Sequence, residues 1–403
     1  MIYFDEVITP DNLVDQYHIA LHGKADQTRQ IKYEELRFLN LDHLYQRLLN
    51  DSYVAGPDNR FTIYEPKKRL IVANDFEDKI VQGLLVRKVL VPLMEPKLIS
   101  DNYASRQGMG TDNAIERLQS HLHNYYITNG NSNIGCFLKG DIRKYFYSVF
   151  VPICHAMIDA LDMDDRLKNL FHQEIRPYDT IDTGICIGHE ISQWLSIYYL
   201  NKMDHTVKED LMIRYYSRYM DDFILLHSSK EYLEYAKIKI SDVLAELHLQ
   251  LNPEKSQIHY IGEGMTFLGF HFYLTESGKV KTILLERSIK DMRRRMFKYE
   301  SLVREDINQM KFVLDGFTSW KSHAVKGDAK KILYLMDMEF FNLYYPYMAK
   351  LGINFSDYCY LPGKFEHDST GHKKSSNYRY LIWAAEIYSK WPIDIDRVRT
   401  FPR

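Results

Sequence analysis

Two apolar stretches joined by a pair of acidic residues constrain this chain more than any other feature. Residues 213–219 and 223–227 are rich in aromatic and aliphatic side chains, and Met220, Asp221 and Asp222 lie between them. This pattern predicts two strands of a buried sheet connected by a tight turn. An Asp-Asp pair is by itself most often a solvated turn, because Asp favours turns. Here the flanking apolar strands indicate that the sheet holds the pair rigidly.

A separate strand delivers a third carboxylate. Residues 135–141 are expected to form a short strand that ends at Asp141. Carboxylates that converge from neighbouring strands can hold two Mg²⁺ ions about 3.5–4 Å apart, which stabilises the attacking and leaving oxygens of an in-line phosphoryl displacement. We therefore predict that Asp141, Asp221 and Asp222 form a metal site for nucleotidyl transfer, with Mn²⁺ as the alternative ion.

Length and composition fit a folded chain of two or three domains. The chain has 403 residues, 45% hydrophobic residues and a net charge of −2, a balance that argues neither for nor against a nucleic-acid partner. There is no apolar run of membrane-spanning length, and the first residues do not resemble a signal peptide. We therefore expect a cytoplasmic protein with no membrane partner. The four cysteines are widely spaced, which is not the pattern of a zinc site or a disulfide scaffold.

The first third of the chain is expected to be rich in helices. Within residues 1–130, one hairpin with a basic tip spans residues 61–72. A helix is expected to begin at Asp78. Pro92 is expected to end this helix, because proline lacks the backbone N–H that a helix interior uses.

The middle of the chain indicates an antiparallel sheet with helices on one face. Within residues 131–275, strands alternate with helices, and a helix is expected over residues 187–208. The pattern Ser228-x-x-Glu231 is typical of a capping box at the start of another helix. The predicted fold class is therefore α+β.

Residues 280–350 are expected to be helical and basic at their start. Lys290, Arg294 and Lys298 share one face of the expected helix, and this face would follow a nucleic-acid backbone. An ordinary charged helix surface is the alternative. Phe317 and Trp320 are expected to pack in the core of this region rather than to stack on bases.

Seven segments resemble the motifs of reverse transcriptases, in the order in which that family has them. Tyr219–Asp222 resembles the catalytic YxDD box, and residues 139–146 resemble the first palm motif. The other matching segments are residues 66–71, 103–111, 184–193, 251–256 and 267–270.

The resemblance implies a right-hand polymerase fold. Fingers would span residues 1–130, the palm residues 131–275, and a helical thumb with the tail residues 276–403. It implies an RNA-directed DNA polymerase that extends a primer 3′-OH with dNTPs on an RNA template. Template RNA, the primer strand and dNTPs would be its partners, joined in diversity-generating relatives by a small basic accessory protein.

The resemblance also assigns roles to the acidic residues and their neighbours. Asp141 and Asp221 would ligate the metal ions directly, the carbonyl of Ile142 would assist them, and Asp222 would be a third, more structural acid. Phe146 would be an aromatic steric gate that clashes with a ribose 2′-hydroxyl. The alternative for Phe146 is a core side chain.

Further residues would surround the nucleotide. Lys68 and Arg69 would hold the triphosphate, because Arg binds phosphate through two parallel hydrogen bonds and Lys acts as a point charge. A solvated basic turn is the alternative for this pair. Gly188 and Gln193 would also contact the substrate. Lys255 would either donate a proton to the leaving pyrophosphate or be an ordinary surface lysine.

One motif departs from the commonest pattern of the family. Most reverse transcriptases have Gln-Gly and end the motif in Ser-Pro, whereas this chain has Ile187-Gly188 and ends in Ser192-Gln193. These residues, together with residues 106–111, resemble the diversity-generating retroelement lineage and related defence-associated enzymes. Within the latter segment, Arg106 would contact template or nucleotide.

Three other functions stay open beside a low-fidelity retroelement enzyme. The first is an antiviral defence polymerase that makes DNA without an ordinary template or with protein as primer. The second is a non-catalytic RNA-binding scaffold, and the third is a nucleotidyl cyclase. Three converging acids count against a scaffold, and the expected thumb counts against a cyclase.

Overall fold

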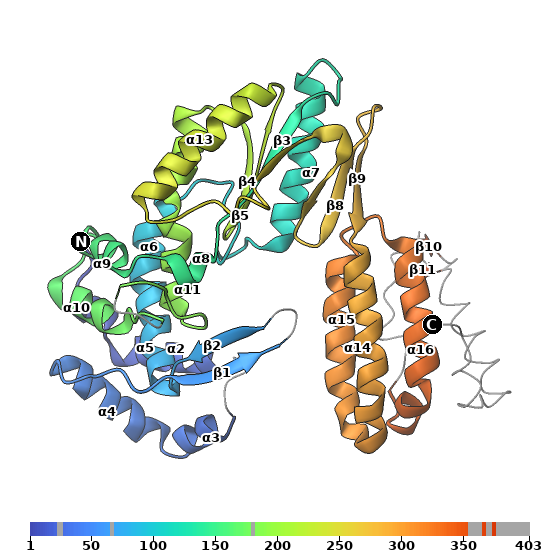
Figure 1. Cartoon of the computed structure of the whole chain (residues 1–403). Helices are drawn as coiled ribbons and strands as arrows, with labels where there is room; N and C mark the ends of the chain where they lie inside the picture. Colours follow the sequence, from blue (N-terminus) through green and yellow to red (C-terminus); the bar gives the residue numbers. More distant parts are fainter. Residues whose placement is uncertain (22–26, 65–67, 179–181, 354–364, 368–372, 376–403) are drawn as a thin grey trace. The chain divides into compact units, whose positions relative to one another are not determined.

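The computed structural model of the chain describes residues 1–21, 27–64, 68–178, 182–353, 365–367 and 373–375. The chain divides into two compact units (Figure 1). Unit 1 contains Met1–Met265 and Tyr273–Val280, and unit 2 contains Thr266–Phe272 and Lys281–Arg403. The predicted boundaries at residues 130 and 275 stay a prediction. Among the described residues, no helix is both long and apolar enough to cross a membrane.

Helices and one hairpin form the first part of unit 1. The helices are α1 (Phe4–Val7), α2 (Pro10–Leu21), α3 (Gln27–Glu35), α4 (Arg37–Leu49) and α5 (Phe76–Leu85). The buried side chains of Leu13, Tyr17 and Ile80 belong to the core in which α2 packs on α5. Strands β1 (Asn59–Ile63) and β2 (Arg69–Ala73) pair antiparallel, which confirms the predicted hairpin.

Helical structure continues past Pro92, so the expectation that Pro92 ends the helix is wrong. After α5 the chain continues through a π-helical turn (Val86–Leu90), helix α6 (Val91–Met94) and a 3₁₀ turn (Glu95–Lys97). Pro92 lies in the first turn of α6, directly after the π-helical turn. The wider turn changes the backbone hydrogen bonding just before Pro92, where the missing N–H would otherwise break the ladder.

A four-stranded antiparallel sheet forms the centre of unit 1. Its strands are β3 (Cys136–Asp141), β4 (Tyr215–Tyr219), β5 (Asp222–His227) and β6 (Gln257–Tyr260), in the order β4-β5-β3-β6. Gly140 lies opposite Phe223, and a Cβ added at Gly140 would lie 2.0 Å from the Phe223 ring. Only glycine therefore fits at this place, and the close contact fixes how β3 and β5 align.

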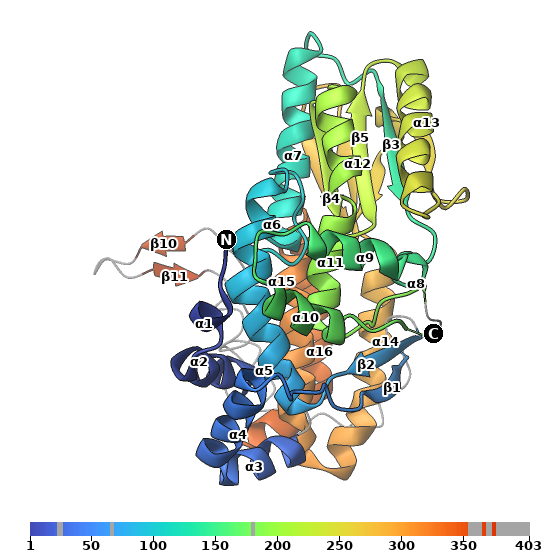
Figure 2. The same ribbon diagram turned by 90° about the vertical axis from the view of Figure 1, so that its left-hand side faces the viewer.

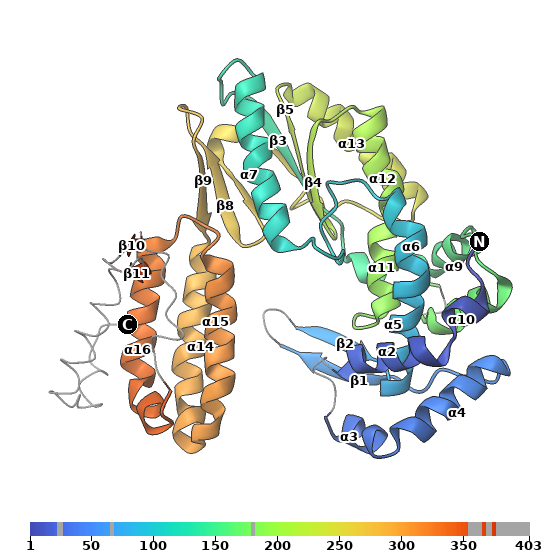
Figure 3. The ribbon, with the colours of Figure 1, turned by 180° about the vertical axis from the view of Figure 1, so that it is seen from behind.

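Helices cover both faces of this sheet, whereas the sequence predicts helices on one face. Ser217 faces α7 (Thr111–Thr128), where its Oγ lies 3.3 Å from Nδ1 of His121. Arg218 faces the opposite side, because successive residues of a strand alternate, and it binds Asp204 of α12 (Asn201–His205). Figures 1 and 3 accordingly show α7 and α13 (Lys230–Glu246) on opposite sides of the sheet. The α+β class itself is confirmed.

Three predicted helix starts differ from the structure, and the first is that of α5, which begins at Phe76 rather than at Asp78. The helix expected over residues 187–208 begins at Glu190, as α11 (Glu190–Tyr199), because His189 before it is extended. Helix α11 packs against α5 (Figures 1 and 2). The N-cap of α13 is Ser229 rather than Ser228, since Ser229 Oγ accepts a hydrogen bond from the Tyr232 N–H at 3.0 Å.

Unit 2 contains a core built on three helices, α14 (Glu286–Glu305), α15 (Met310–Ala324) and α16 (Lys330–Lys350). Residues 280–284 form strand β9 (Val280–Leu284) rather than the expected helix, and β9 pairs with β8 (Phe270–Leu274). Phe317 is buried in the core, and Trp320 packs on it while donating a hydrogen bond to Ser288 Oγ at 3.0 Å. The prediction that these aromatic residues pack in the core is confirmed.

We predict that His121 makes the stability of unit 1 depend on pH. Burial lowers the pKa of His121 from 6.5 to about 4, despite the nearby carboxylate of Asp101. As the pH falls from about 6.5 to about 4, His121 therefore binds a proton in the unfolded chain but not in the folded chain, and the folded state loses stability. In the parent protein, His121 should lower the free energy of unfolding by up to about 3 kcal/mol over this pH range, and His121→Gln should abolish this decrease. Urea unfolding at pH 7.5 and pH 4.5 measures this loss.

His123 supplies the control, because it lies on the same helix with an exposed side chain. His123→Gln should leave the pH dependence of the parent protein in place. Equal pH dependence in His121→Gln and the parent would contradict the role of His121.

Candidate active site

The ends of β3 and β5 bring the three predicted carboxylates together. Asp141 and Asp222 lie directly opposite each other in the strand register, and Asp221 lies in the turn that leads into β5. All three line one cavity of about 950 Å³ in unit 1. Met220, in the same turn, has a φ of 56°, which is a left-handed conformation that is unusual for a residue with a Cβ.

Burial and neighbouring acids raise the pKa values of Asp222 and Asp221. Burial and then the charges of Asp221 and Asp141 raise the pKa of Asp222 to about 7, although Lys139 acts to lower it. Burial and then Asp141 also raise the pKa of Asp221. Among the described residues, the buried Oδ1 of Asp222 has no hydrogen-bond partner, and Lys139 Nζ is 3.9 Å away. Three close carboxylates with an unpaired buried oxygen form a donor set that suits a hard divalent cation.

The loop after α13 holds Asp141 in place. Lys255 Nζ lies 3.0 Å from both carboxylate oxygens of Asp141, and Asn252 Nδ2 donates a hydrogen bond to Oδ2 at 3.2 Å. The Asp141 backbone N–H donates to Ser256 Oγ at 3.1 Å. The predicted residue Lys255 is therefore beside the acids. Sequence reasoning singled out the motif of Asn252 and Ser256 but not these two contacts.

Basic side chains border the same cavity. The predicted residues Lys68 and Arg69 line it at the start of β2, and both are exposed. The charge of Arg69 acts to lower the pKa of Asp221, against the raising effect of burial. Arg143 and Lys144 also line the cavity. Sequence reasoning missed this pair, although both residues lie within the segment that follows Asp141.

The remaining predicted substrate residues lie on the cavity wall. Phe146, Gln193 and Ile142 all line it, and Phe146 is only partly buried. The Ile185 N–H donates a hydrogen bond to the Phe146 carbonyl at 2.9 Å, which fixes the backbone beneath the ring. The side chain of Ile142 is buried.

Ile187 and Gly188 line the cavity where they meet β2. The Val72 N–H donates a hydrogen bond to the Ile187 carbonyl at 2.9 Å. Gly188 has a φ of 126°, and a Cβ added there would lie 2.5 Å from the Val72 carbonyl oxygen. Glycine at this place therefore allows the hairpin and the loop before α11 to approach closely.

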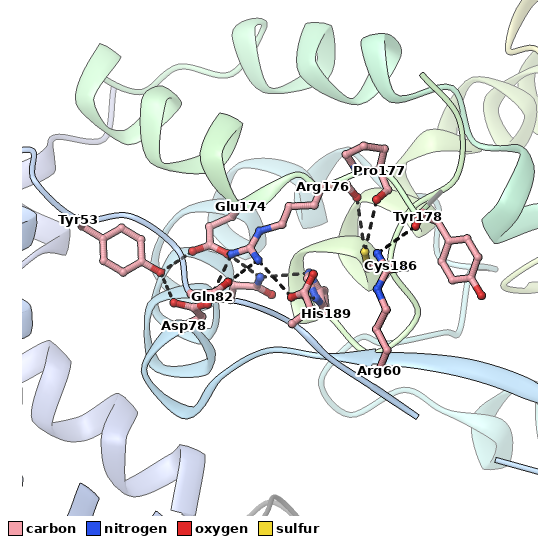
Figure 4. A network of polar contacts seen from close by, with 12 residues as sticks. Tyr53, Arg60, Asp78, Gln82, Glu174, Arg176, Pro177, Tyr178, Cys186 and His189 are labelled. Atoms are coloured by element: carbon pink, nitrogen blue, oxygen red, sulfur yellow. Dashed lines mark hydrogen bonds and ion pairs between the residues drawn. The ribbon is translucent and has the colours of Figure 1, made fainter. Parts of the chain in front are cut away.

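A buried polar network binds the loop before α11 through His189 (Figure 4). His189 Nε2 lies 3.1 Å from Asp58 Oδ1, and its Nδ1 lies 3.4 Å from Gln82 Nε2. Gln82 in turn donates a hydrogen bond to Glu174 at 2.7 Å. Arg176 donates to the same oxygen of Asp58 at 3.2 Å. The network joins α5, the segment before β1 and the end of α10 (Asp165–Glu174) to the loop that carries Gly188.

Part of this network has the residue types of a metal site. The donor atoms of Asp58, Cys186 and His189 all lie within 4.8 Å of one another. Burial raises the pKa of Cys186 to about 11, so the thiol stays protonated at neutral pH. The thiol lies 3.6 Å from the Arg176 carbonyl, and Arg176 binds Asp58. These engaged polar atoms give the cluster a structural role.

Arg106 does not line the cavity of the carboxylates. The guanidinium of Arg106 donates hydrogen bonds to the carbonyls of Ile99 at 2.9 Å and Asn102 at 2.8 Å. These contacts explain Arg106 structurally, and its contact with template or nucleotide stays a prediction. Lys290, Arg294 and Lys298 belong to α14 of unit 2, where they also stay a prediction.

Comparisons with known proteins agree with the motifs. A family model described as "Reverse transcriptase (RNA-dependent DNA polymerase)" matches residues 62–272. The protein YkfC of Escherichia coli (strain K12) is 23% identical over 313 residues, which cover 65% of this chain and 80% of YkfC.

Solved telomerase structures are more distant matches. Apo telomerase of Candida tropicalis matches with a TM-score of 0.42 and 15% identity, over 57% of this chain and 56% of that one. Telomerase of Candida albicans in complex with a fragment of telomeric RNA matches with a TM-score of 0.44 and 11% identity, over 76% of this chain and 65% of that one. This chain therefore spans about three fifths of the length of these telomerase chains.

We predict that Gly188→Ala separates the loop before α11 from β2. The left-handed φ and the Cβ contact with Val72 should lower the free energy of unfolding by about 2 kcal/mol or more. Gly262→Ala is the control, because a Cβ added at Gly262 has no described atom within 4 Å. Urea unfolding of both variants tests the prediction, and equal stability would contradict the close approach.

Proposed function

This chain belongs to the reverse transcriptase (RNA-dependent DNA polymerase) family, and from that premise we propose that its cavity in unit 1 performs two-metal nucleotidyl transfer. The family model covers more than half of the chain, from residue 62 to residue 272. We therefore propose that the chain is an RNA-directed DNA polymerase with the right-hand fold. The proposed reaction joins a primer 3′-OH to the α-phosphate of a dNTP on an RNA template.

The convergence of three carboxylates in one cavity carries this proposal. Asp141 and Asp221 would bind the metal ions, the Ile142 carbonyl would assist, and Asp222 would complete the negative charge. We propose Mg²⁺, with Mn²⁺ as a substitute. When bound, two such ions polarise the phosphoryl oxygens and activate the attacking hydroxyl.

The basic side chains of the cavity would bind the rest of the nucleotide. Lys68 and Arg69 border the cavity together with the acids, and we propose that they hold the triphosphate. Lys255 already binds Asp141, so its ammonium group would be within reach of the leaving pyrophosphate once substrate replaces that contact. Gly188 and Gln193 would border the base and sugar. In unit 2, Lys290, Arg294 and Lys298 would contact the nucleic-acid backbone.

The biological role that we propose is low-fidelity synthesis of the diversity-generating type. Ile187 lines the cavity, and this supports the proposal that its side chain acts on the incoming nucleotide. A small basic accessory protein would be the further partner. A defence enzyme with untemplated or protein-primed synthesis is the competing role, and the products made on a defined RNA distinguish the two.

Asp221→Asn should reduce primer extension by at least about a hundredfold, because it removes one negative charge from the metal site while keeping the side-chain shape. The measurement is single-turnover extension of a DNA primer on an RNA template. Asp210→Asn is the control, since Asp210 is an exposed acid elsewhere in unit 1. Extension at the parent rate in folded Asp221→Asn would refute the catalytic assignment.

Measuring the binding of primer–template distinguishes a variant that has lost catalysis from one that has lost affinity for nucleic acid. Asp221→Asn should bind primer–template about as well as the parent. Replacing Lys290, Arg294 and Lys298 together with Gln should weaken this binding and flatten its dependence on salt, because fewer counterions are released.

Phe146→Ala should admit ribonucleotides. A ring at this place on the cavity wall would meet a 2′-hydroxyl, so its removal should raise the rNTP/dNTP ratio of kcat/KM by at least about tenfold. Phe146→Tyr keeps the ring and should keep the parent ratio. An unchanged ratio in Phe146→Ala would show that another residue selects the sugar.

Ile187→Gln should lower misincorporation. The Gln amide can hydrogen-bond near the nascent base pair, whereas Ile holds it by shape alone, so we expect an error frequency roughly threefold to tenfold lower. Sequencing of cDNA made on one defined RNA measures this frequency. Ile187→Leu, which keeps an apolar side chain of the same volume, is the control. Equal error frequencies in Ile187→Gln and the parent would favour the defence role.

A further inference from the structure

Arg218 is a fully buried arginine directly before the catalytic turn. It lies on β4, and its relative exposure is 0%. Its guanidinium donates hydrogen bonds to acceptors on two helices and the turn. These acceptors are Asp204 Oδ1 at 2.7 Å, Asp204 Oδ2 at 2.5 Å, the Ile197 carbonyl at 3.0 Å and the Met220 carbonyl at 2.9 Å.

The pairing with Asp204 fixes the direction of the guanidinium. Both carboxylate oxygens of Asp204 bind it, and the Tyr216 hydroxyl donates a further hydrogen bond to Asp204 Oδ1 at 2.7 Å. A fork of this kind has one geometry, whereas a lysine ammonium has no such plane. A buried ion pair is on its own weak evidence for stability, because desolvation offsets the attraction. The specific geometry is therefore the informative feature.

The Nη1 group of Arg218, which does not bind Asp204, donates a hydrogen bond to the turn. Nη1 of Arg218 binds the carbonyl of Met220, and this carbonyl belongs to the peptide that joins Met220 to Asp221. Met220 has a φ of 56°, a conformation that is unfavourable for a residue with a Cβ and that persists only where surrounding contacts fix it. The hydrogen bond thus fixes the peptide plane from which the Asp221 carboxylate enters the cavity.

We propose that Arg218, oriented by Asp204, is a positioning residue that sets the Asp221 carboxylate in its metal-binding orientation. The inference rests on the proposed function, because it gives Asp221 the role of a metal ligand. Arg218 acts through the backbone of the turn and does not line the cavity itself.

The test uses Arg218→Lys, which keeps the charge and loses the fork. Groups that orient metal ligands contribute about tenfold to a hundredfold in metal affinity, so the Mg²⁺ concentration for half-maximal extension should rise by at least about tenfold. The KM for dNTP should change little, because Lys68 and Arg69 are untouched. The rise in Tm that Mn²⁺ causes without substrate should also shrink, since bound metal stabilises the folded state.

Arg166→Lys is a matched control. Arg166 also binds one carboxylate and two carbonyls, with Nε 3.0 Å from Asp51 Oδ1 and Nη2 at 3.2 Å and 2.6 Å from the carbonyls of Leu48 and Leu49. It does not line the active-site cavity. Arg166→Lys should therefore keep the parent Mg²⁺ requirement and the parent Mn²⁺ shift in Tm.

A folded Arg218→Lys with the parent Mg²⁺ requirement and the parent Mn²⁺ shift would overturn the inference. If Arg218→Lys does not fold, Tyr216→Phe decides, because it loosens Asp204 while keeping the ion pair. Tyr216→Phe should also raise the Mg²⁺ requirement, by a smaller factor than Arg218→Lys. An unchanged Mg²⁺ requirement in Tyr216→Phe would overturn the inference. Activity in Asp221→Asn would instead refute the proposed function, so the two failures are distinguishable.

Discussion

The pairing of β3 with β5 is the constraint on which the rest of the site depends. Their register places Asp141 opposite Asp222, and the close contact between Gly140 and the Phe223 ring leaves little freedom to change it. A slip by one residue would turn the side chains of β3 to the other face of the sheet. The carboxylates would then no longer share a cavity.

The negative charge of the three neighbouring carboxylates needs compensation by positive charge, and the surrounding residues compensate the three acids unequally. Lys255 binds Asp141 with two contacts of 3.0 Å, whereas Lys139 lies 3.9 Å from Asp222, whose pKa is raised by burial and by its acidic neighbours to about 7. Helices α11 and α12 reach the turn through the Arg218–Asp204 pair. The negative charge of Asp222 is thus less compensated than that of Asp141, and such uncompensated charge favours a bound cation.

The sequence predicts much of this because short-range patterns determine it. The strand–turn–strand at Asp221 and the hairpin before Ala73 follow from alternation and turn chemistry, and both are present. The helix continuing past Pro92 was not predictable from the residue alone, since a π-helical turn before it changes the local hydrogen bonding. Arg218 and Asp204 were missed for another reason. They are fourteen residues apart on different elements, and only the folded sheet shows that both are buried together.

The most direct test of the account is to locate the metal ions in a complex. A crystal structure of the protein with RNA template, chain-terminated DNA primer, dNTP and Mn²⁺ would show them by anomalous scattering. We predict two peaks about 3.5–4 Å apart, in contact with the carboxylates of Asp141 and Asp221 and the phosphates of the nucleotide. Peaks elsewhere, for example between Asp58, Cys186 and His189, with none at Asp221, would contradict this prediction.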